Sequence, residues 1–198
     1  MVSRADQAVA LFREGFNCSQ SVFATYADLF GMDRETALRV SASFGAGIGR
    51  MREVCGAASG MFLVAGLLSG ATEGKDQTAK KNNYEIVQFL AAEFKKKNGG
   101  SYICRELLGL DKAVGKSIPG GVMPEARTDE YYKKRPCPVT IHGAAEIIEY
   151  VLLDGLVETD AEGKDSLISG VDYTGHILRR IAYLKQAEAD QSAADTEV

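Results

Sequence analysis

The residues in this chain best suited to chemistry are its four cysteines, Cys18, Cys55, Cys104 and Cys137. The steps between them are 37, 49 and 33 residues, so the sequence holds no Cys-x-x-Cys pair. Structural zinc sites usually take closely spaced ligand pairs, and thioredoxin-like proteins use Cys-x-x-Cys. A site that uses all four thiols must therefore be assembled by folding from separate segments.

Each cysteine is predicted to lie at or near the start of a helix. The capping residue Asn17 precedes Cys18, a serine stands three positions before Cys104, a proline follows Cys137, and an uncharged helix is expected to begin close to Cys55. The unpaired N–H groups and partial positive charge of a helix start stabilise a thiolate, so we expect a lowered pKa at each thiol. The same direction is expected from three nearby arginines, Arg52, Arg105 and Arg135.

The cysteines are also expected to point inward. Cys18 lies four positions before Val22 and Cys137 four before Ile141, so each shares its helix face with core residues. Inward thiols at helix starts could meet in one site, and the residues leave its chemistry open. The thiolates match the ligand set of a [2Fe–2S] or [4Fe–4S] cluster or of zinc, pairs of thiols could cycle through disulfides, and the alternative is four inert, buried side chains.

The elements that must position these residues are predicted to be helices almost throughout. Apolar residues recur at helical spacing over residues 5–15, 18–30, 34–43, 52–68, 78–97, 101–108, 137–153 and 174–188, and no alternating strand pattern of useful length occurs. The predicted fold class is all-α. A compact multi-helix bundle is expected over residues 5–153, and a C-terminal extension over residues 154–198 is expected to hold a linker, a helix and a frayed acidic tail.

Composition excludes several classes of function. The net charge is −4, with 45% hydrophobic and 25% charged residues, which is ordinary globular composition and is unsuited to wrapping nucleic acid. The 19 residues from Val54 to Thr72 carry no charge, but glycines and serines dilute them, which favours a buried central helix over a membrane span. The chain begins without a secretory signal pattern, so we expect a cytoplasmic protein with reduced cysteines.

Other candidate residues surround the cysteines. Gly45-x-Gly47-x-Gly49 lacks the spacing of a dinucleotide-binding loop and is expected to form a tight turn that sets Cys55 in place. Gly56 and Gly60 lie on one helix face and could let another helix or a cofactor such as a cluster approach the backbone closely. His142 lies five positions after the last cysteine. It is expected to be a partly buried histidine with satisfied hydrogen bonds, or else a ligand or proton donor. The Tyr131–Arg135 segment is expected to be a solvated loop or a positively charged collar around that cysteine.

The cysteines and their surroundings resemble the four-cysteine family known as C-GCAxxG-C-C, a family described as redox-active. The resemblance covers Ala5 to Leu153. It rests on the segments Phe16-Asn17-Cys18-Ser19-Gln20-Ser21-Val22, Phe44 to Glu53, Cys55-Gly56-Ala57-Ala58-Ser59-Gly60, Cys104-Arg105-Glu106-Leu107-Leu108-Gly109 and Cys137-Pro138. A more distant likeness is to split-Soret cytochromes c, which carry haem and an iron–sulfur cluster. The chain has no Cys-x-x-Cys-His, which excludes covalent haem.

Three functional hypotheses follow. The first is an oxidoreductase or electron carrier in which Cys18, Cys55, Cys104 and Cys137 are redox-active thiols that bind an iron–sulfur cluster or cycle through disulfides. The second is a non-enzymatic module that sequesters a soft metal such as Cu(I) or Zn²⁺, or that assists a transport system. The third is a structural protein with inert thiols. The expected partner is an electron donor or acceptor, or a transport system, and the sequence does not identify it.

Overall fold

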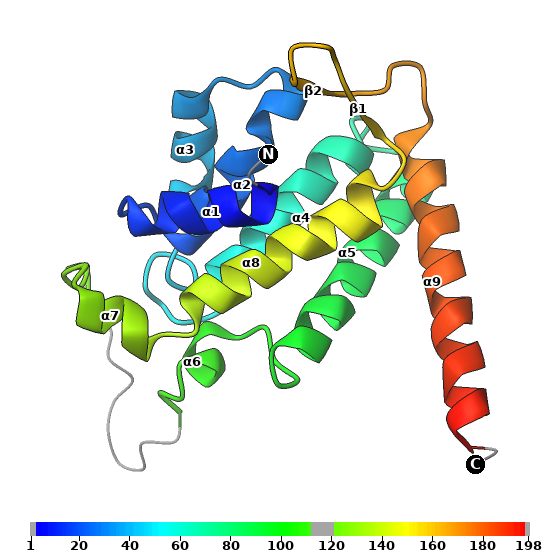
Figure 1. The fold of residues 1–198 in the computed structure, drawn as a ribbon. Coiled ribbons are helices and arrows are strands. Elements are labelled where there is room, and N and C mark those ends of the chain that lie inside the picture. The colour runs from blue at the N-terminus through cyan, green and yellow to red at the C-terminus, as the bar shows by residue number, and fades with distance from the viewer. Residues whose placement is uncertain (1–2, 112–120, 197–198) are drawn as a thin grey trace.

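Residues 3–111 and 121–196 are described by a computed structural model of the chain, and helices dominate them (Figure 1). The α-helices are α1 (Arg4–Arg13), α2 (Cys18–Tyr26), α3 (Arg34–Ala42), α4 (Gly56–Ser69), α5 (Gln77–Lys97), α6 (Cys104–Leu107), α7 (Asp129–Lys134), α8 (Cys137–Ile147) and α9 (Tyr173–Thr196). Two other helical segments, η1 (Ala27–Phe30) and η2 (Ile148–Leu153), continue α2 and α8. The prediction of a predominantly α-helical, compact fold is confirmed.

Side-chain caps explain why several of these helices begin where they do. The Asn17 side chain accepts hydrogen bonds from the backbone N–H groups of Ser19 and Gln20, and Gln20 accepts one from the Asn17 N–H in return. This capping box satisfies donors that a helix start leaves without partners. Asp33 and Asp76 cap α3 and α5 in a similar way. The start of α2, and with it the position of Cys18, is therefore encoded locally.

The core forms where α2 and α4 cross. A methyl group placed on Gly60 would lie 2.9 Å from the Ser19 carbonyl oxygen and 2.9 Å from the Val22 Cβ atom. One placed on Gly56 would lie 3.1 Å from the Cys18 Cβ atom. The glycines therefore let two helix backbones approach each other more closely than any larger residue permits. This is the helix-packing alternative anticipated for the pair.

Helix α4 is the central helix of the bundle. It packs against α2, α5 and α8, and Met61, Val64 and Ala65 on it are fully buried. Its apolar composition is therefore explained by its burial in the core of the protein. Among the residues that the structure describes, no helix combines the length and hydrophobicity required to cross a bilayer.

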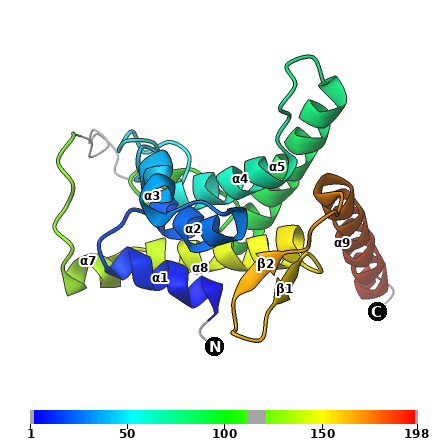
Figure 2. The ribbon, with the colours of Figure 1, turned by 90° about the horizontal axis from the view of Figure 1, so that it is seen from above.

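The second layer consists of α8 with its continuation η2, and of α5 and α9 beside them. Ile141, Ala144, Ile148 and Val151 form the buried stripe expected for this helix. The chain then turns through a hairpin of β1 (Val157–Thr159) and β2 (Asp165–Leu167), and α9 packs against α5 and η2. Figure 2 shows α9 on the opposite side of the molecule from α7.

Three local expectations were wrong. The hairpin β1–β2 was missed because its strands have only three residues each, too few for an alternating pattern. The loop expected as one alternative for the segment Tyr131–Arg135 is largely a helix, α7, which the Thr128 side chain caps. Helix α9 continues to Thr196, well beyond the predicted end, because its alanine-rich end has high helix propensity.

Candidate functional site

The structure brings all four cysteines to one small pocket. Cys18, Cys104 and Cys137 are the first residues of α2, α6 and α8, and Cys55 is the residue directly before α4. All four line the same cavity of about 40 Å³. In Figure 1, α6, α7 and the start of α8 lie near one another at the lower left of the molecule. The expected placement at helix starts therefore holds for each cysteine.

A short backbone pairing positions two of the thiols. Val54 and Ile103 form an isolated antiparallel bridge, in which the Cys55 N–H donates to the Tyr102 carbonyl oxygen at 2.8 Å and the Cys104 N–H to the Glu53 carbonyl oxygen at 2.6 Å. In an antiparallel pair, the residues that follow the two bridged residues lie diagonally across the ladder on one face. The bridge thereby directs Cys55 and Cys104 to the same side.

The segment before this bridge has an uncommon backbone conformation. Ala46, Ile48, Arg50 and Arg52 have φ angles between 55° and 70°, and Gly47 and Gly49 lie in the same left-handed region. Side chains disfavour that region, so successive residues in it store strain. A methyl group on Gly47 would lie 2.6 Å from the Cys104 Cβ atom. The tight turn expected here thus exists, delays the start of α4 from the predicted Arg52 to Gly56, and packs directly against the site.

Three arginines give the pocket its charge. Arg52, Arg127 and Arg135 line it together with Tyr131 and Thr140, and no carboxylate is among the described residues of the lining. One carboxylate stands behind them: Glu125 accepts two hydrogen bonds from Arg135 at 2.5 Å and lies 3.4 Å from Arg52. The described lining therefore carries a surplus of positive charge.

Each arginine is held in a different way. Arg52 is only 2% exposed and acts on the Cys104 thiol, whose pKa it lowers. Arg127 packs against two aromatic rings, with its guanidinium carbon 4.6 Å from the centre of the Phe12 ring and 4.7 Å from that of Tyr131. Its Nη2 donates to the Phe16 carbonyl oxygen at 3.4 Å, whereas its Nη1 is buried and has no hydrogen-bond partner.

One thiol is poised to ionise. The interaction with the Cys18 thiol, followed by the positive charges of Arg135 and Arg127, lowers the pKa of Cys137 to about 7. The same interaction, together with burial, raises the pKa of Cys18 well above its ordinary value. The pocket thus combines a Cys137 thiolate with a neutral Cys18 thiol, which are the protonation states that an attacking and a resolving sulfur need.

The other two thiols are held neutral. Burial raises the pKa of Cys55 to about 12, although the backbone amides of Ala57 and Ala58 act in the opposite direction. Burial also raises the pKa of Cys104, an effect that Arg52 opposes. The expectation of a lowered pKa at all four thiols was therefore wrong for three of them. Desolvation outweighs the helix start at Cys55 and Cys104, and at Cys18 the interaction with Cys137 acts together with burial.

The described side chains form no metal-binding arrangement. Across residues 3–111 and 121–196, no group of three or more Cys, His, Asp and Glu side chains is placed so that it could hold a metal ion, and the four cysteines are free thiols. Metal ligation requires thiolates, so a metal would have to displace the protons that three of these thiols carry in the structure. The number of sulfur donors on the pocket matches the ligand set of a cluster.

The remaining predicted site residues fall in different places. Gly56 lines the thiol pocket, and Gly60 is one turn deeper, against α2. His142 faces Asp6 and Glu146 at 3.8 and 3.5 Å in a separate groove, away from the cysteines. Arg127 was missed, because no pattern in the sequence marks it, although it directly precedes Thr128, the cap of α7. Tyr131 and Arg135 line the pocket, as the predicted collar would.

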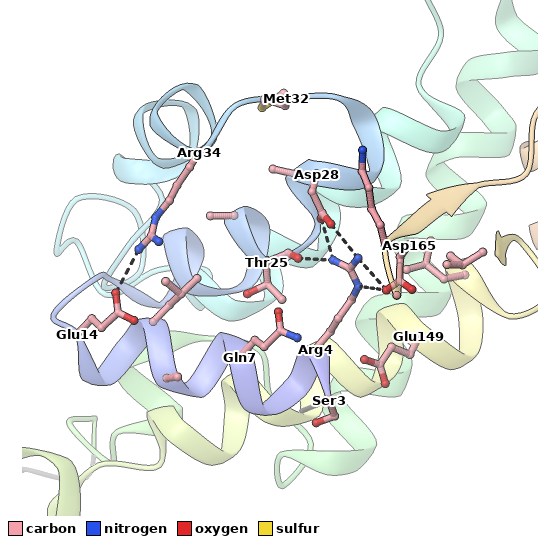
Figure 3. A pocket seen from close by; sticks show the side chains of 18 residues that line it. Ser3, Arg4, Gln7, Glu14, Thr25, Asp28, Met32, Arg34, Glu149 and Asp165 are labelled. Carbon is pink, nitrogen blue, oxygen red and sulfur yellow. Dashed lines mark hydrogen bonds and ion pairs between the residues drawn. The ribbon is translucent and has the colours of Figure 1, made fainter. Parts of the chain in front are cut away.

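A larger cavity, of about 980 Å³, lies elsewhere (Figure 3). Several of its charged residues are already paired with one another. Arg4 donates to both oxygens of Asp28, to Asp165 and to the Thr25 carbonyl, and Arg34 pairs with Glu14. We therefore place the chemistry in the smaller thiol pocket.

The fold and the pocket define a class: an all-α protein that gathers four cysteine thiols, with arginines, at the starts of its core helices. Comparison with known families gives the same result. The family described as "Putative redox-active protein (C_GCAxxG_C_C)" matches residues 16–151, more than half of the chain. The chain belongs to this family, as its four-cysteine pattern predicted. No curated protein and no solved structure matches it.

Proposed function

We propose that this protein is a thiol–disulfide oxidoreductase or electron carrier in which Cys137 attacks and Cys18 resolves. One observation carries the proposal: all four cysteines line one small pocket, and Cys18 is the group there that acts most strongly on Cys137. The lowered pKa of Cys137, about 7, supports the assignment of the nucleophile, because the thiolate is the reactive form.

The proposed step balances as a two-electron oxidation. The Cys137 thiolate attacks an oxidised acceptor, such as a disulfide, and forms a covalent bond to it while a leaving group departs with an electron pair. Cys18 loses its proton and attacks the Cys137 sulfur, which forms the Cys18–Cys137 disulfide and releases the acceptor reduced by two electrons. A thiol donor then reduces the disulfide. This cycle requires a reducing thiol pool, so we place the protein in the cytoplasm.

An iron–sulfur cluster is the second candidate, and the four sulfur atoms on one pocket are the observation that favours it. Cys18, Cys55, Cys104 and Cys137 would be its ligands. Within the described residues no three of these side chains are placed to hold a metal ion, so we derive no step through a cluster. A soft-metal store or a transport accessory would use the same thiols without disulfide chemistry.

One experiment separates these functions. The full chain is purified without oxygen, and iron, zinc, acid-labile sulfide and free thiols are counted before and after treatment with diamide, a thiol oxidant. We expect four thiols before treatment, two after it, and a Cys18–Cys137 disulfide in peptide mass maps. Iron with labile sulfide would instead assign a cluster, metal without sulfide would assign sequestration, and four unreactive thiols would refute redox chemistry.

Matched serine variants test the pairing. Cys137→Ser and Cys18→Ser should each abolish the fast disulfide, whereas Cys55→Ser should keep it. Equal loss in all of these variants would contradict the assigned pair.

A further inference from the structure

The thiol pocket has features that a dithiol alone does not require. Arg52, Arg127 and Arg135 line it, and no described residue of the lining is acidic. A single thiolate at Cys137 balances only one of these charges. Glu125 contacts Arg52 and Arg135 but is not part of the lining. The positive charges around the pocket thus outnumber the negative ones, and a further anion would be attracted to it.

Arg127 supplies an independent observation. Its Nη1 is buried without a hydrogen-bond partner, although a buried donor on a charged group normally has one. The stacking of its guanidinium on Phe12 and Tyr131 fixes its orientation, and its charge acts on Cys137. A rigid, unpaired and charged donor next to a nucleophile is suited to bind a negatively charged oxygen.

The size of the cavity limits the ligand. A cavity of about 40 Å³ has space for about three water molecules, since each needs roughly 10–15 Å³ by this measure. A peptide, a nucleotide or a glutathione molecule cannot be enclosed in a space of this size, although a larger reagent can reach the half-buried Cys137 from outside it. A small inorganic oxyanion of four or five heavy atoms is the largest ligand that fits inside after displacing that water.

We infer that the oxidant reduced at this pocket is a small tetrahedral oxyanion whose central atom accepts two electrons, bound by Arg127 beside Cys137 and Cys18. The inference rests on the proposed dithiol chemistry and names its substrate class. Arg135 and the Tyr131 hydroxyl complete the set of donors, since burial raises the pKa of Tyr131 and keeps it protonated.

The chemistry balances with arsenate as the probe. The Cys137 sulfur bonds to arsenic, and one arsenate oxygen leaves as water after taking up protons. Cys18 then attacks the Cys137 sulfur, so that the sulfur–arsenic bond breaks and arsenic keeps the electron pair. In sum, two thiols and H₂AsO₄⁻ give one disulfide, H₂AsO₃⁻ and water.

The test uses the reduced full chain without oxygen at constant ionic strength. Sulfate, a tetrahedral anion that thiols do not reduce, should slow alkylation of Cys137 by iodoacetamide. Arsenate should convert two thiols into the Cys18–Cys137 disulfide and yield one arsenite. Arg127→Met should weaken both effects at least about tenfold, the loss expected for one hydrogen bond to a charged group. Arg127→Lys, which keeps the charge, should restore part of them.

Arg34→Met is the matched control, because Arg34 also stacks on an aromatic ring, Phe16, but does not line the thiol pocket. It should behave as the unchanged protein.

Diamide shows whether a variant still forms the disulfide and therefore still holds its pocket together. A disulfide with diamide but none with arsenate would overturn the inference and leave the proposed function standing. So would an Arg127→Met protein that responds normally to both anions. Absence of the disulfide with every oxidant would overturn both proposals.

Discussion

Replacing Arg135 by glutamine should make Cys137 less reactive at neutral pH. The Arg135 charge is one of the causes that lower the pKa of Cys137 from its ordinary value near 9 to about 7, after the interaction with Cys18. A neighbouring opposite charge typically shifts a pKa by about one unit or more. A rise of about one unit would reduce the thiolate fraction at pH 7 from about one half to about one tenth. Alkylation of Cys137 at pH 7 should therefore slow about fivefold.

The assay is the pH dependence of Cys137 alkylation, followed by peptide mass spectrometry so that the other thiols do not contribute. Many groups act on this profile: Cys137 is surrounded by Cys18, Cys55, Cys104, Arg52, Arg127, Arg135 and Tyr131, with Glu125 behind the arginines. The midpoint should lie near pH 7 in the unchanged protein and move upward in Arg135→Gln.

Two further variants make this prediction refutable. Glu125→Gln removes the carboxylate that offsets Arg135, so the midpoint should move downward. Arg105→Gln removes a partly exposed arginine that pairs with Glu53 and does not line the pocket, so the midpoint should stay in place. The electrostatic explanation fails if the Arg135 and Glu125 variants shift in the same direction, or if the Arg105 variant shifts as far as either.

Three stability predictions follow from packing and backbone geometry, each measured by urea unfolding followed by circular dichroism. Gly60→Ala should cost about 1–3 kcal/mol because its methyl group would press on α2, whereas Gly66→Ala, on the same helix but with open space around it, should be neutral or stabilising. Ala46→Gly should stabilise by about 1 kcal/mol, since glycine accepts a φ of 55° without strain; a clear loss would show that no strain is stored there. Ile181→Ala, at a 1% exposed position of α9, should cost about 2–4 kcal/mol, whereas Tyr183→Ala, at 63% exposure, should change little; equal losses would mean that α9 does not pack as described.

Much of the fold could be predicted because its signals are local. The cap at Asn17 sets the start of α2, and the apolar spacing from Ile141 to Val151 sets the buried face of α8 and η2. The hairpin β1–β2 could not be found in this way, since Asp160 stabilises its turn through backbone hydrogen bonds that no apolar pattern accompanies. The left-handed segment from Ala46 to Arg52 was also inaccessible in detail, because only its glycines indicate a turn.

The sequence allowed us to predict where the four cysteines lie along the helices, but not the pKa values of their thiols. Placement at helix starts could be read from caps and prolines near Cys18 and Cys137. The pKa of each thiol depends on burial and on contacts between segments distant in sequence, such as that between Cys104 and Arg52. Arg127 belongs to the same category, because tertiary packing alone brings it to the pocket.

The pKa pattern of the pocket follows from the proximity of the thiols. Each negative charge raises the pKa of the thiols around it, and burial raises the cost of every further charge. Ionisation of Cys137 therefore helps to keep Cys18, Cys55 and Cys104 protonated. Selection among the four falls to Cys18 and to the arginines, whose effects converge on Cys137. A pocket that holds one thiolate among neutral thiols has a defined direction of attack, because only the ionised sulfur is a strong nucleophile.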